Sequence, residues 1–260
     1  MKTVLLLLCA LSILAVAACA GSRAPAPRGE AHQPAPVVAD HSACNPTPEP
    51  EPERDPEPET PSHPGFIVTT GVHGNEPSGY LIKPELEALG FTVYGPCNPW
   101  GIENNRRHLE DGRDLNRMFG RDDCPEAETI KQWLADNPPK FLLDLHEDPD
   151  GTAPYLIQHG PDDDIGRRIV DALKDEYEFD PEPQFMMVKG EDGLLNPDGK
   201  TLAMMAFMKI YGLGFYAWAT YKCTAIVVEC PGSWPEEKRK AYHLKVVQTA
   251  ARLFEESNRD

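Results

Sequence analysis

The stretch "GFIVTTGVHGNEPSG", residues 65–79, joins a short apolar run to a compact turn that holds three glycines and a proline. The apolar and β-branched half, 65–71, predicts a buried strand. The turn that follows carries His73 and Glu76, two side chains of the kinds that bind zinc. A surface turn rich in glycine and asparagine explains the same composition, so the choice depends on whether the chain supplies a further ligand and a base.

Candidate strands and helices alternate along the rest of the chain, apart from a loop-like stretch that ends near residue 123. Strands are predicted at 91–95, 140–147, 153–160, 183–190 and 223–232, and helices at 79–90, 125–137, 162–178, 201–212 and 235–256. This order predicts an α/β fold, a three-layer α/β/α sandwich around a mixed, largely parallel sheet. Ligands bind at the carboxyl ends of strands in such sheets. His73, His146 and Glu229 all fall at or just after predicted strand ends, which supports a zinc site.

The first 20 residues have the pattern of an export signal. Lys2 precedes two apolar runs, 4–11 and 13–20, and together they are short for a membrane span of about 20 apolar residues. The end of the run, V-A-A-C, resembles the lipobox of bacterial lipoproteins. We therefore expect residues 1–19 to be a signal peptide with a lipobox and Cys19 to carry a lipid that anchors the protein to a membrane. Ordinary cleavage after Ala20 is the alternative.

A tether and one domain are expected after the signal. Residues 20–64 include "PTPEPEPERDPEPETP", whose alternating proline and glutamate predict a disordered, extended spacer. Residues 65–260 are predicted to form a single catalytic domain in the bacterial cell envelope, facing the periplasm or the cell surface. The chain has a net charge of −17 and no basic cluster, which argues against a nucleic-acid partner.

Four cysteines lie in the predicted domain: Cys97, Cys124, Cys223 and Cys230. Export to an oxidising compartment would allow one or two disulfides, but buried free thiols explain the same residues. Their spacings match no zinc ribbon, and no pairing follows from them.

His146 is the best candidate for the missing ligand. A catalytic zinc takes three protein ligands and keeps one open position, and two histidines with one glutamate form an established set. His146 lies in "LLDLHED", where an apolar strand turns charged at its end. A single histidine at a strand end is more often structural, but the presence of "HGNE" at another strand end favours ligation. We expect one zinc ion on His73, Glu76 and His146.

Five motifs occur in an order that resembles the zinc carboxypeptidase superfamily. They are "GVHGNEPSG" (71–79), "NPWG" (98–101), "DGRDLNRMF" (111–119), "LDLHE" (143–147) and "VVECPG" (227–232). The resemblance covers 65–260. It is strongest to the compact branch that includes succinylglutamate desuccinylase and aspartoacylase, and to small bacterial carboxypeptidases.

The resemblance implies a role for each motif residue. His73, Glu76 and His146 would hold the zinc. Asn116 and Arg117 would bind the free carboxylate of the substrate, for which the planar arginine fork is suited. In the same motif, Asp114 would accept a hydrogen bond from His73 and fix its tautomer.

The resemblance also implies the catalytic groups. Glu229 would be the general base and acid, and an arginine would stabilise the oxyanion of the tetrahedral intermediate. Arg107 matches the spacing of the small bacterial members, and Arg106 competes with it.

Two departures from the family leave questions open. The larger carboxypeptidases have a loop tyrosine, and Tyr211, Tyr216 and Tyr221 are all candidates here. The methionines and aromatic residues of 204–221 are compatible with a specificity pocket, but methionine at helical spacing is more typical of a core helix.

The predicted function is that of an exported zinc metallocarboxypeptidase that hydrolyses an amide bond next to a free C-terminal carboxylate, in periplasmic or cell-wall peptides. An N-acyl-amino-acid deacylase would use the same residues. The 31 residues after Glu229 read as one helix, whereas aspartoacylase-like proteins have an extra β domain there, and this favours a peptide substrate. An inactive binding lipoprotein that retains the fold is the third possibility.

Overall fold

The computed structural model describes residues 62–161, 164–185, 188–209 and 211–258. The predicted signal peptide, Cys19 and the tether as far as residue 61 lie outside the described residues. Residues 62–64 contact the domain, because the His63 ring stacks on Phe91 at 4.2 Å between centroids and its Nδ1 lies 2.6 Å from Glu255 Oε1.

A six-stranded sheet with the order β2-β1-β3-β8-β4-β7 forms the centre of the domain. Its strands are β1 (Phe66–Thr70), β2 (Thr92–Tyr94), β3 (Phe141–Asp148), β4 (Tyr155–His159), β7 (Leu194–Leu195) and β8 (Thr224–Pro231). The strands β2, β1, β3 and β8 are parallel, β4 is antiparallel to β8, and β7 is parallel to β4. The predicted α/β fold with a mixed, largely parallel sheet is therefore confirmed.

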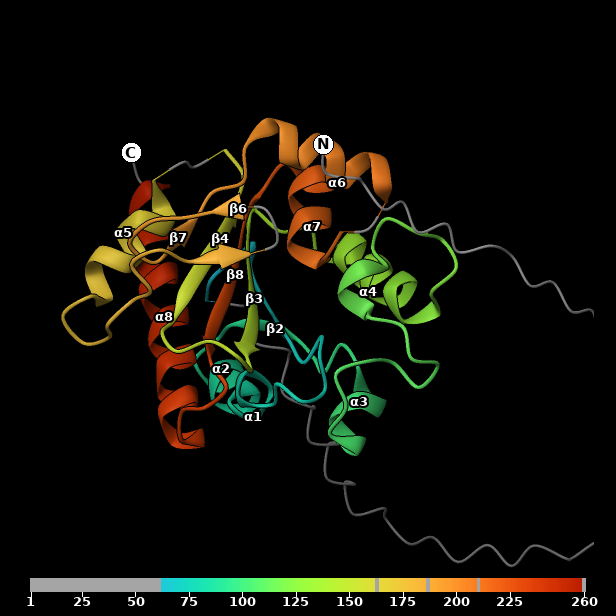
Figure 1. The fold of residues 1–260 in the computed structure, drawn as a ribbon, viewed down its shortest axis with the longest axis horizontal. Coiled ribbons are helices and arrows are strands. Elements are labelled where there is room, and N and C mark those ends of the chain that lie inside the picture. The colour runs from blue at the N-terminus through green and yellow to red at the C-terminus, as the bar shows by residue number, and fades with distance from the viewer. Residues whose placement is uncertain (1–61, 162–163, 186–187, 210, 259–260) are drawn as a thin grey trace, which may run out of the picture. The chain divides into compact units, whose positions relative to one another are not determined.

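Helices cover both faces of the sheet (Figure 1). One face packs against α1 (Ser78–Leu81), α2 (Lys83–Ala88), α5 (Ile165–Leu173) and α8 (Glu236–Ser257), and the other against α4 (Pro125–Asp136) and α7 (Leu213–Tyr221). We call the apolar core under α1, α2, α5 and α8 the first core and the core under α4 and α7 the second core. In β3, Leu143 and Leu145 belong to the first core and Leu142 to the second. Central strands are buried on both faces, which explains why their sequences are continuously apolar.

Several elements differ from the sequence-based expectation. The helix expected at 79–90 is divided into α1 and α2, and Pro84 occupies the first turn of α2. The strand expected at 183–190 is a separate two-stranded ribbon of β5 (Gln184–Phe185) and β6 (Val188–Lys189). The expected loop before residue 123 contains α3 (Pro99–Asn104) and the 3-10 turn η1 (Leu115–Arg117).

Three findings bear on the expectations about the α6 methionines, a membrane span and the cysteines. The helix α6 (Gly199–Met208) has no buried residue, so the prediction of a core helix there is wrong. In the part of the chain that the structure describes, no single helix is long and apolar enough to cross a membrane. By length and composition alone, only α6 and α7 taken together, bent by 102°, meet that requirement. The four cysteines of the domain are buried free thiols.

Candidate metal centre and its cavity

The turn after β1 is compact because two glycine backbones pack directly on each other. A Cβ atom on Gly74 would overlap the Gly101 backbone, and one on Gly101 would overlap the Asn98 side chain and the Arg106 carbonyl, so both positions require glycine. The Asn98 side chain caps α3 by accepting a hydrogen bond from the Gly101 N–H at 2.9 Å. The motifs "HGNE" and "NPWG" therefore fold against each other, and this packing turns His73 and Glu76 into the domain, where both are buried.

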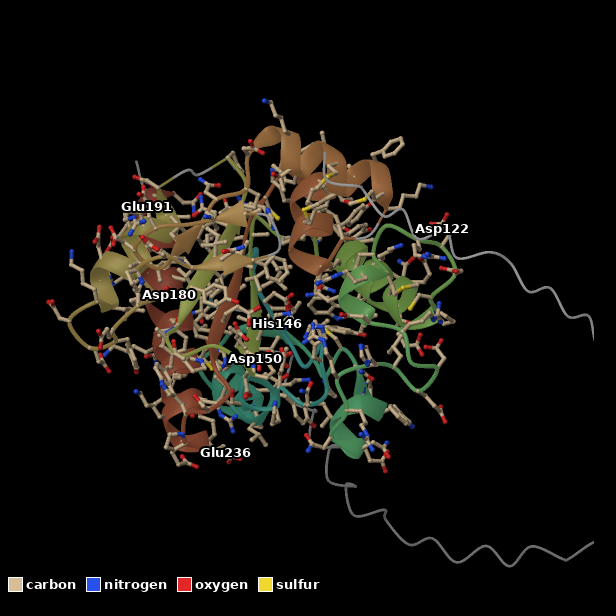
Figure 2. The ribbon with its side chains drawn as sticks, viewed as in Figure 1. Asp122, His146, Asp150, Asp180, Glu191 and Glu236 are labelled. Atoms are coloured by element: carbon tan, nitrogen blue, oxygen red, sulfur yellow. The ribbon has the colours of Figure 1, made fainter. Side chains whose placement is uncertain are left out.

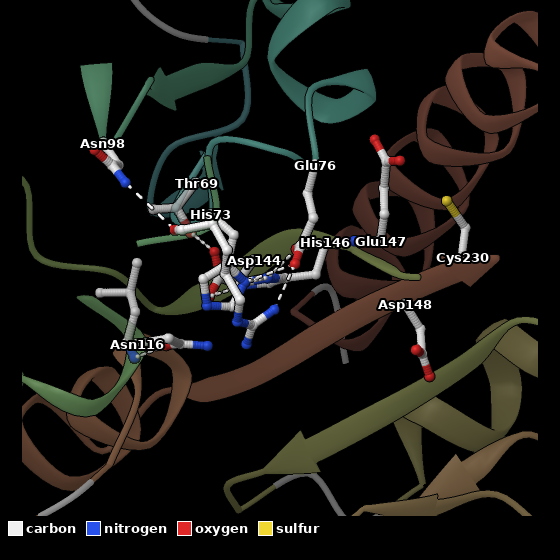
Figure 3. Close-up of polar contacts among 12 residues, drawn as sticks. Thr69, His73, Glu76, Asn98, Asn116, Asp144, His146, Glu147, Asp148 and Cys230 are labelled. Carbon is white, nitrogen blue, oxygen red and sulfur yellow. Dashed lines mark hydrogen bonds and ion pairs between the residues drawn. The ribbon is translucent and has the colours of Figure 1, made fainter. Parts of the chain in front are cut away.

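Three side chains from two strand ends converge on one point in Figure 3, and Figure 2 marks the position of one of them, His146, within the domain. Ligand atoms of His73, Glu76 and His146 all lie within 4.8 Å of one another. The two Glu76 oxygens lie 2.8 Å from Nδ1 of His73 and 2.8 Å from Nδ1 of His146. The sequence-predicted ligand set is thus brought together in one buried cluster.

The outer nitrogen of each histidine faces a carboxylate. His73 Nε2 lies 3.1 Å from Asp114 Oδ1, and His146 Nε2 lies 3.0 Å from Asp144 Oδ2. Asp144 is itself held by the Thr69 hydroxyl, which donates a hydrogen bond of 2.8 Å. Both ring nitrogens of each histidine therefore face a carboxylate oxygen, Glu76 on the Nδ1 side and an aspartate on the Nε2 side. With a metal ion on Nδ1, the Nε2 of each histidine would carry the proton and donate it to its aspartate.

This arrangement fits a divalent metal. Two imidazole lone pairs and a carboxylate are all acceptors, so a cation or protons must lie among them. Burial raises the pKa of Glu76, but hydrogen bonds from His146 and His73 outweigh burial and hold that pKa well below its usual range. The pKa of His146 lies well above its usual range, because the Asp144 and Glu76 carboxylates outweigh its burial. Imidazole and carboxylate ligands in this ratio suit zinc.

Arg107 borders the metal centre and Arg106 does not. The Arg107 guanidinium donates to Glu76 Oε1 at 2.9 Å and to Asp114 Oδ2 at 3.4 Å, and its side chain remains 35% exposed to the cavity side. Arg106 is exposed and is absent from the cavity lining. Burial raises the pKa of Asp114, but the His73 hydrogen bond and the charges of His73, Arg107 and Arg117 hold it well below its usual range.

Glu229 lies beside the metal cluster through strand pairing. In the sheet register it pairs with His146 on β3 and with Tyr155 on β4. Its half-buried carboxylate lines the cavity, and no hydrogen bond holds it among the described residues. Burial first, and the nearby Glu76 and Asp148 carboxylates, raise the pKa of Glu229 to about 8, although His146 opposes this shift.

Asn116 and Arg117, here called the carboxylate clamp after the role predicted for them, lie on η1 at the edge of the same cavity. Asn116 Oδ1 accepts a hydrogen bond of 3.0 Å from the Leu213 N–H, the first residue of α7. This bond fixes the amide orientation and leaves the Nδ2 hydrogens as donors. Arg117 donates to the Asn116 carbonyl at 2.7 Å, and its guanidinium lies 5.8 Å from the Phe185 ring centre.

One cavity of about 460 Å³ joins these groups. His73, Glu76, Arg107, Glu229 and the carboxylate clamp all line it. The described structure therefore places a candidate metal centre, the Glu229 carboxylate and two side chains with hydrogen-bond donors, Asn116 and Arg117, around one space.

Sequence reasoning did not single out Asp144 or Tyr155. Asp144 lies two residues before His146 on β3, so both point to the same face of the sheet, and the period of two could have revealed the pair. Tyr155 lines the cavity beside Glu229, and its hydroxyl donates to Asp148 Oδ2 at 2.9 Å. Of the three tyrosines proposed for the site, Tyr211 lines the cavity, whereas Tyr216 and Tyr221 pack against the second core.

The charged end of β3 also includes a residue with a structural role. Glu147 is buried, and its carboxylate accepts hydrogen bonds of 2.7 Å from the Ser78 N–H and 2.7 Å from Arg239 on α8. Figure 3 shows Glu147 turned away from the His73–His146 cluster. These two hydrogen bonds fix the start of α1 and the N-terminal end of α8 to β3, the strand that carries His146.

Solved structures of peptidases share this fold. A candidate metallopeptidase from Shewanella amazonensis is 18% identical, with a TM-score of 0.59 over 74% of this chain and 77% of that chain. A second, from Shewanella baltica, is 16% identical, with a TM-score of 0.58 over 76% and 77%. Helicobacter pylori Csd4, a D,L-carboxypeptidase in its mDAP-bound form, is 18% identical, with a TM-score of 0.57 over 75% of this chain and 51% of that one.

This chain thus spans about half of the Csd4 chain that it matches. At these identities the likeness defines the fold alone. No protein-family model matches the chain, and no curated protein matches it. The fold and the buried cluster together define an α/β protein that shares its fold with these solved structures and has a site that could hold a metal ion.

Proposed function

We propose that the protein is an exported zinc-dependent metallocarboxypeptidase, which hydrolyses the amide bond next to a free C-terminal carboxylate of a peptide. The observation that carries the proposal is the shared cavity. The candidate metal cluster, the Glu229 carboxylate and the carboxylate clamp of Asn116 and Arg117 all face one space of about 460 Å³. A peptide terminus bound at the clamp would present its last amide bond to the other two groups.

His73, Glu76 and His146 would hold the zinc ion. A zinc ion there supplies a Lewis acid, which acidifies water and polarises a carbonyl oxygen. Asp114 and Asp144 keep the two Nδ1 atoms available by fixing the tautomers.

The remaining steps belong to residues of the chain. Glu229 takes a proton from the attacking water and returns it to the leaving amine, which is the work of a general base and acid. Arg107 has guanidinium hydrogens beyond those bound to Glu76 and Asp114, and these stabilise the oxyanion.

A deacylase that acts on N-acyl amino acids is the alternative, because it needs the same metal, base and carboxylate clamp. The solved mDAP-bound and tripeptide-bound forms of Csd4 support a peptide substrate for the proposal. Incubating the zinc-loaded protein with a peptide library, muropeptides and N-acyl amino acids, followed by mass spectrometry, separates the two. Loss of one C-terminal residue from peptides is expected. Release of an acyl acid alone would favour the deacylase.

An inactive binding lipoprotein is the rival from another class. Loss of a ligand or of the base would mark such a protein, and His73, Glu76, His146 and Glu229 are all present at the cavity or in the cluster beside it. The mass-spectrometry experiment also decides this point, because a binding protein would leave every substrate in the library intact.

We further propose that Cys19 is lipidated and that the protein is held in the bacterial cell envelope on the tether of residues 20–64. The proposal rests on V-A-A-C at the end of the apolar run and on the alternating proline and glutamate that follow. In a bacterial host, Cys19→Ala should move the protein from the membrane fraction to the soluble fraction. Equal membrane association of the parent and the variant would contradict lipidation.

A further inference from the structure

The part of the cavity farther from the metal cluster is apolar. We call it the apolar compartment. Its floor is formed by β4 and β8, and its walls by α6, α7 and the β5–β6 ribbon. The lining side chains include Ile157, Phe185, Met204, Met208, Phe215 and Val227. Among the described residues that these elements contribute to the lining, Glu229 is the one with a carboxylate, and Gln184 and Thr201 are polar but uncharged.

The register of β4 and β8 gives the direction of the apolar compartment. Glu229 pairs with Tyr155, Val227 pairs with Ile157, and Ala225 pairs with His159. Side chains two residues apart on a strand share a face, so Tyr155, Ile157 and His159 form one row. Four residues of strand span about 13 Å, and His159 therefore ends the row that begins beside the catalytic carboxylate.

The Nδ1 atom of His159 is a buried polar atom without a hydrogen-bond partner among the described residues. The side chain of His159 is 6% exposed, and the residue lines the cavity. Its nearest aromatic neighbours are Phe215 and Trp218, at 6.0 and 6.3 Å between ring centres. Burial lowers the pKa of His159 to about 4, so the imidazole is neutral at pH 7 and offers one donor and one acceptor.

The carboxylate clamp opens onto the apolar compartment. Asn116 bonds the first N–H of α7, and Arg117 lies over Phe185, so both clamp residues touch its walls. A residue whose carboxylate is bound at the clamp would therefore place its side chain between α7 and the strand floor.

We propose that the apolar compartment receives the side chain of the C-terminal residue of the substrate, and that His159 selects a large aromatic side chain with a hydroxyl at its far end, as in tyrosine. This inference rests on the proposed carboxypeptidase function. A long apolar side chain is needed to cover the row from Val227 to His159. A terminal hydroxyl would supply a hydrogen-bond partner to this imidazole, whose Nδ1 has none among the described residues.

The same features disfavour other terminal residues. A lysine or diaminopimelate ammonium would be buried there without a counter-charge, which is costly. Alanine would leave the apolar walls without contact. Gly214 sets the width of the compartment, because a Cβ atom there would lie 3.1 Å from Val227 Cγ2 and 3.7 Å from His159 Cδ2.

The test measures binding separately from turnover. Zinc-loaded Glu229→Gln protein is titrated calorimetrically with N-acetylated dipeptides that differ only in a terminal tyrosine, phenylalanine, alanine or lysine. Tyrosine should bind about tenfold more tightly than phenylalanine, the effect expected of one hydrogen bond to a buried group. Alanine and lysine should bind more weakly than both. Adding His159→Leu should abolish the difference between tyrosine and phenylalanine and retain phenylalanine binding.

Two further variants test the width of the apolar compartment and whether the effect is specific to His159. Gly214→Ala, which narrows the apolar compartment, should weaken tyrosine and phenylalanine relative to alanine. His63→Leu, a histidine outside the cavity, should leave the tyrosine preference unchanged. Equal binding of tyrosine and phenylalanine, a preference for lysine, or an unchanged ratio in the His159→Leu background would overturn the inference.

A parallel hydrolysis assay with the wild-type protein tests the carboxypeptidase function separately from the role of His159. If these dipeptides bind with the expected preference but are not cleaved, the proposed carboxypeptidase function fails and the binding site for an aromatic side chain stands. If they are cleaved without preference for tyrosine, the function stands and the role of His159 fails. Absence of any binding overturns both.

Discussion

Asp144→Asn tests whether the carboxylates behind the histidines prepare the metal site. The change keeps the size of a side chain that is fully buried and touches both His146 Nε2, at 3.0 Å, and the Thr69 hydroxyl, at 2.8 Å. The amide oxygen can still accept from His146, and Thr69 can turn its hydroxyl toward the Leu143 carbonyl at 3.3 Å. The fold should therefore survive while the negative charge is lost.

The expected result is weaker zinc binding. Loss of such a partner typically costs 10–100-fold in metal affinity, about 1.4–2.7 kcal/mol, because the imidazole becomes a poorer base and its tautomer is less fixed. A competition titration with a chromophoric zinc chelator measures the affinity, and thermal melting in excess chelator checks the metal-free fold.

Asp171→Asn is the matched control. It makes the same chemical change at an exposed position of α5, where Asp171 pairs only with Lys174 at 2.9 Å. Its zinc affinity should equal that of the parent. The reasoning fails if Asp144→Asn binds zinc as tightly as the parent, or if it melts so early without metal that the loss reflects unfolding.

Two other substitutions test the carboxylate clamp and His159 independently. Arg117→Ala should weaken binding of a peptide with a free carboxylate by about 1.5–3 kcal/mol, the range for a hydrogen bond to a charged group, and equal losses for the free and amidated peptides in steady-state kinetics would argue against the clamp. Folding lowers the pKa of His159 from 6.5 to about 4 because the ring is buried. Between these two pH values the unfolded chain binds a proton at this residue and the folded protein does not, so the free energy of unfolding should drop as the pH falls from 6.5 to 4. In urea titrations of chelated protein, His159→Leu should reduce that drop by up to about 3 kcal/mol, and parallel pH profiles of the two proteins would refute the assignment.

The site strands were predictable because their signal is local. An apolar run that ends in a polar residue identified β1, β3 and β8, and their parallel order brings the ends of the strands to one edge of the sheet. His73, Glu76 and His146 meet there for that reason, and Glu229 follows from its register beside His146.

The walls of the cavity were not predictable from the same signals. The helix α7 reads "LGFYAWATY", which is apolar all round and shows no helical period, so no helix was expected there. The methionines of α6 predicted a core helix, yet Met204 and Met208 line a cavity from a helix with no buried residue. Their place depends on how α6 and the β5–β6 ribbon pack over the sheet, which is a tertiary property.

In the proposed function, Glu229 moves the proton in a zinc-dependent cleavage beside a free carboxylate. The most direct measurement is the turnover of a peptide with a free C-terminus by zinc-loaded parent and by Glu229→Gln, with bound zinc determined on the same samples. We expect both proteins to hold the same amount of zinc and the variant to turn over about 10²–10⁴-fold more slowly, the usual contribution of a general base. Normal turnover by Glu229→Gln, or loss of its zinc, would contradict the role assigned to this residue.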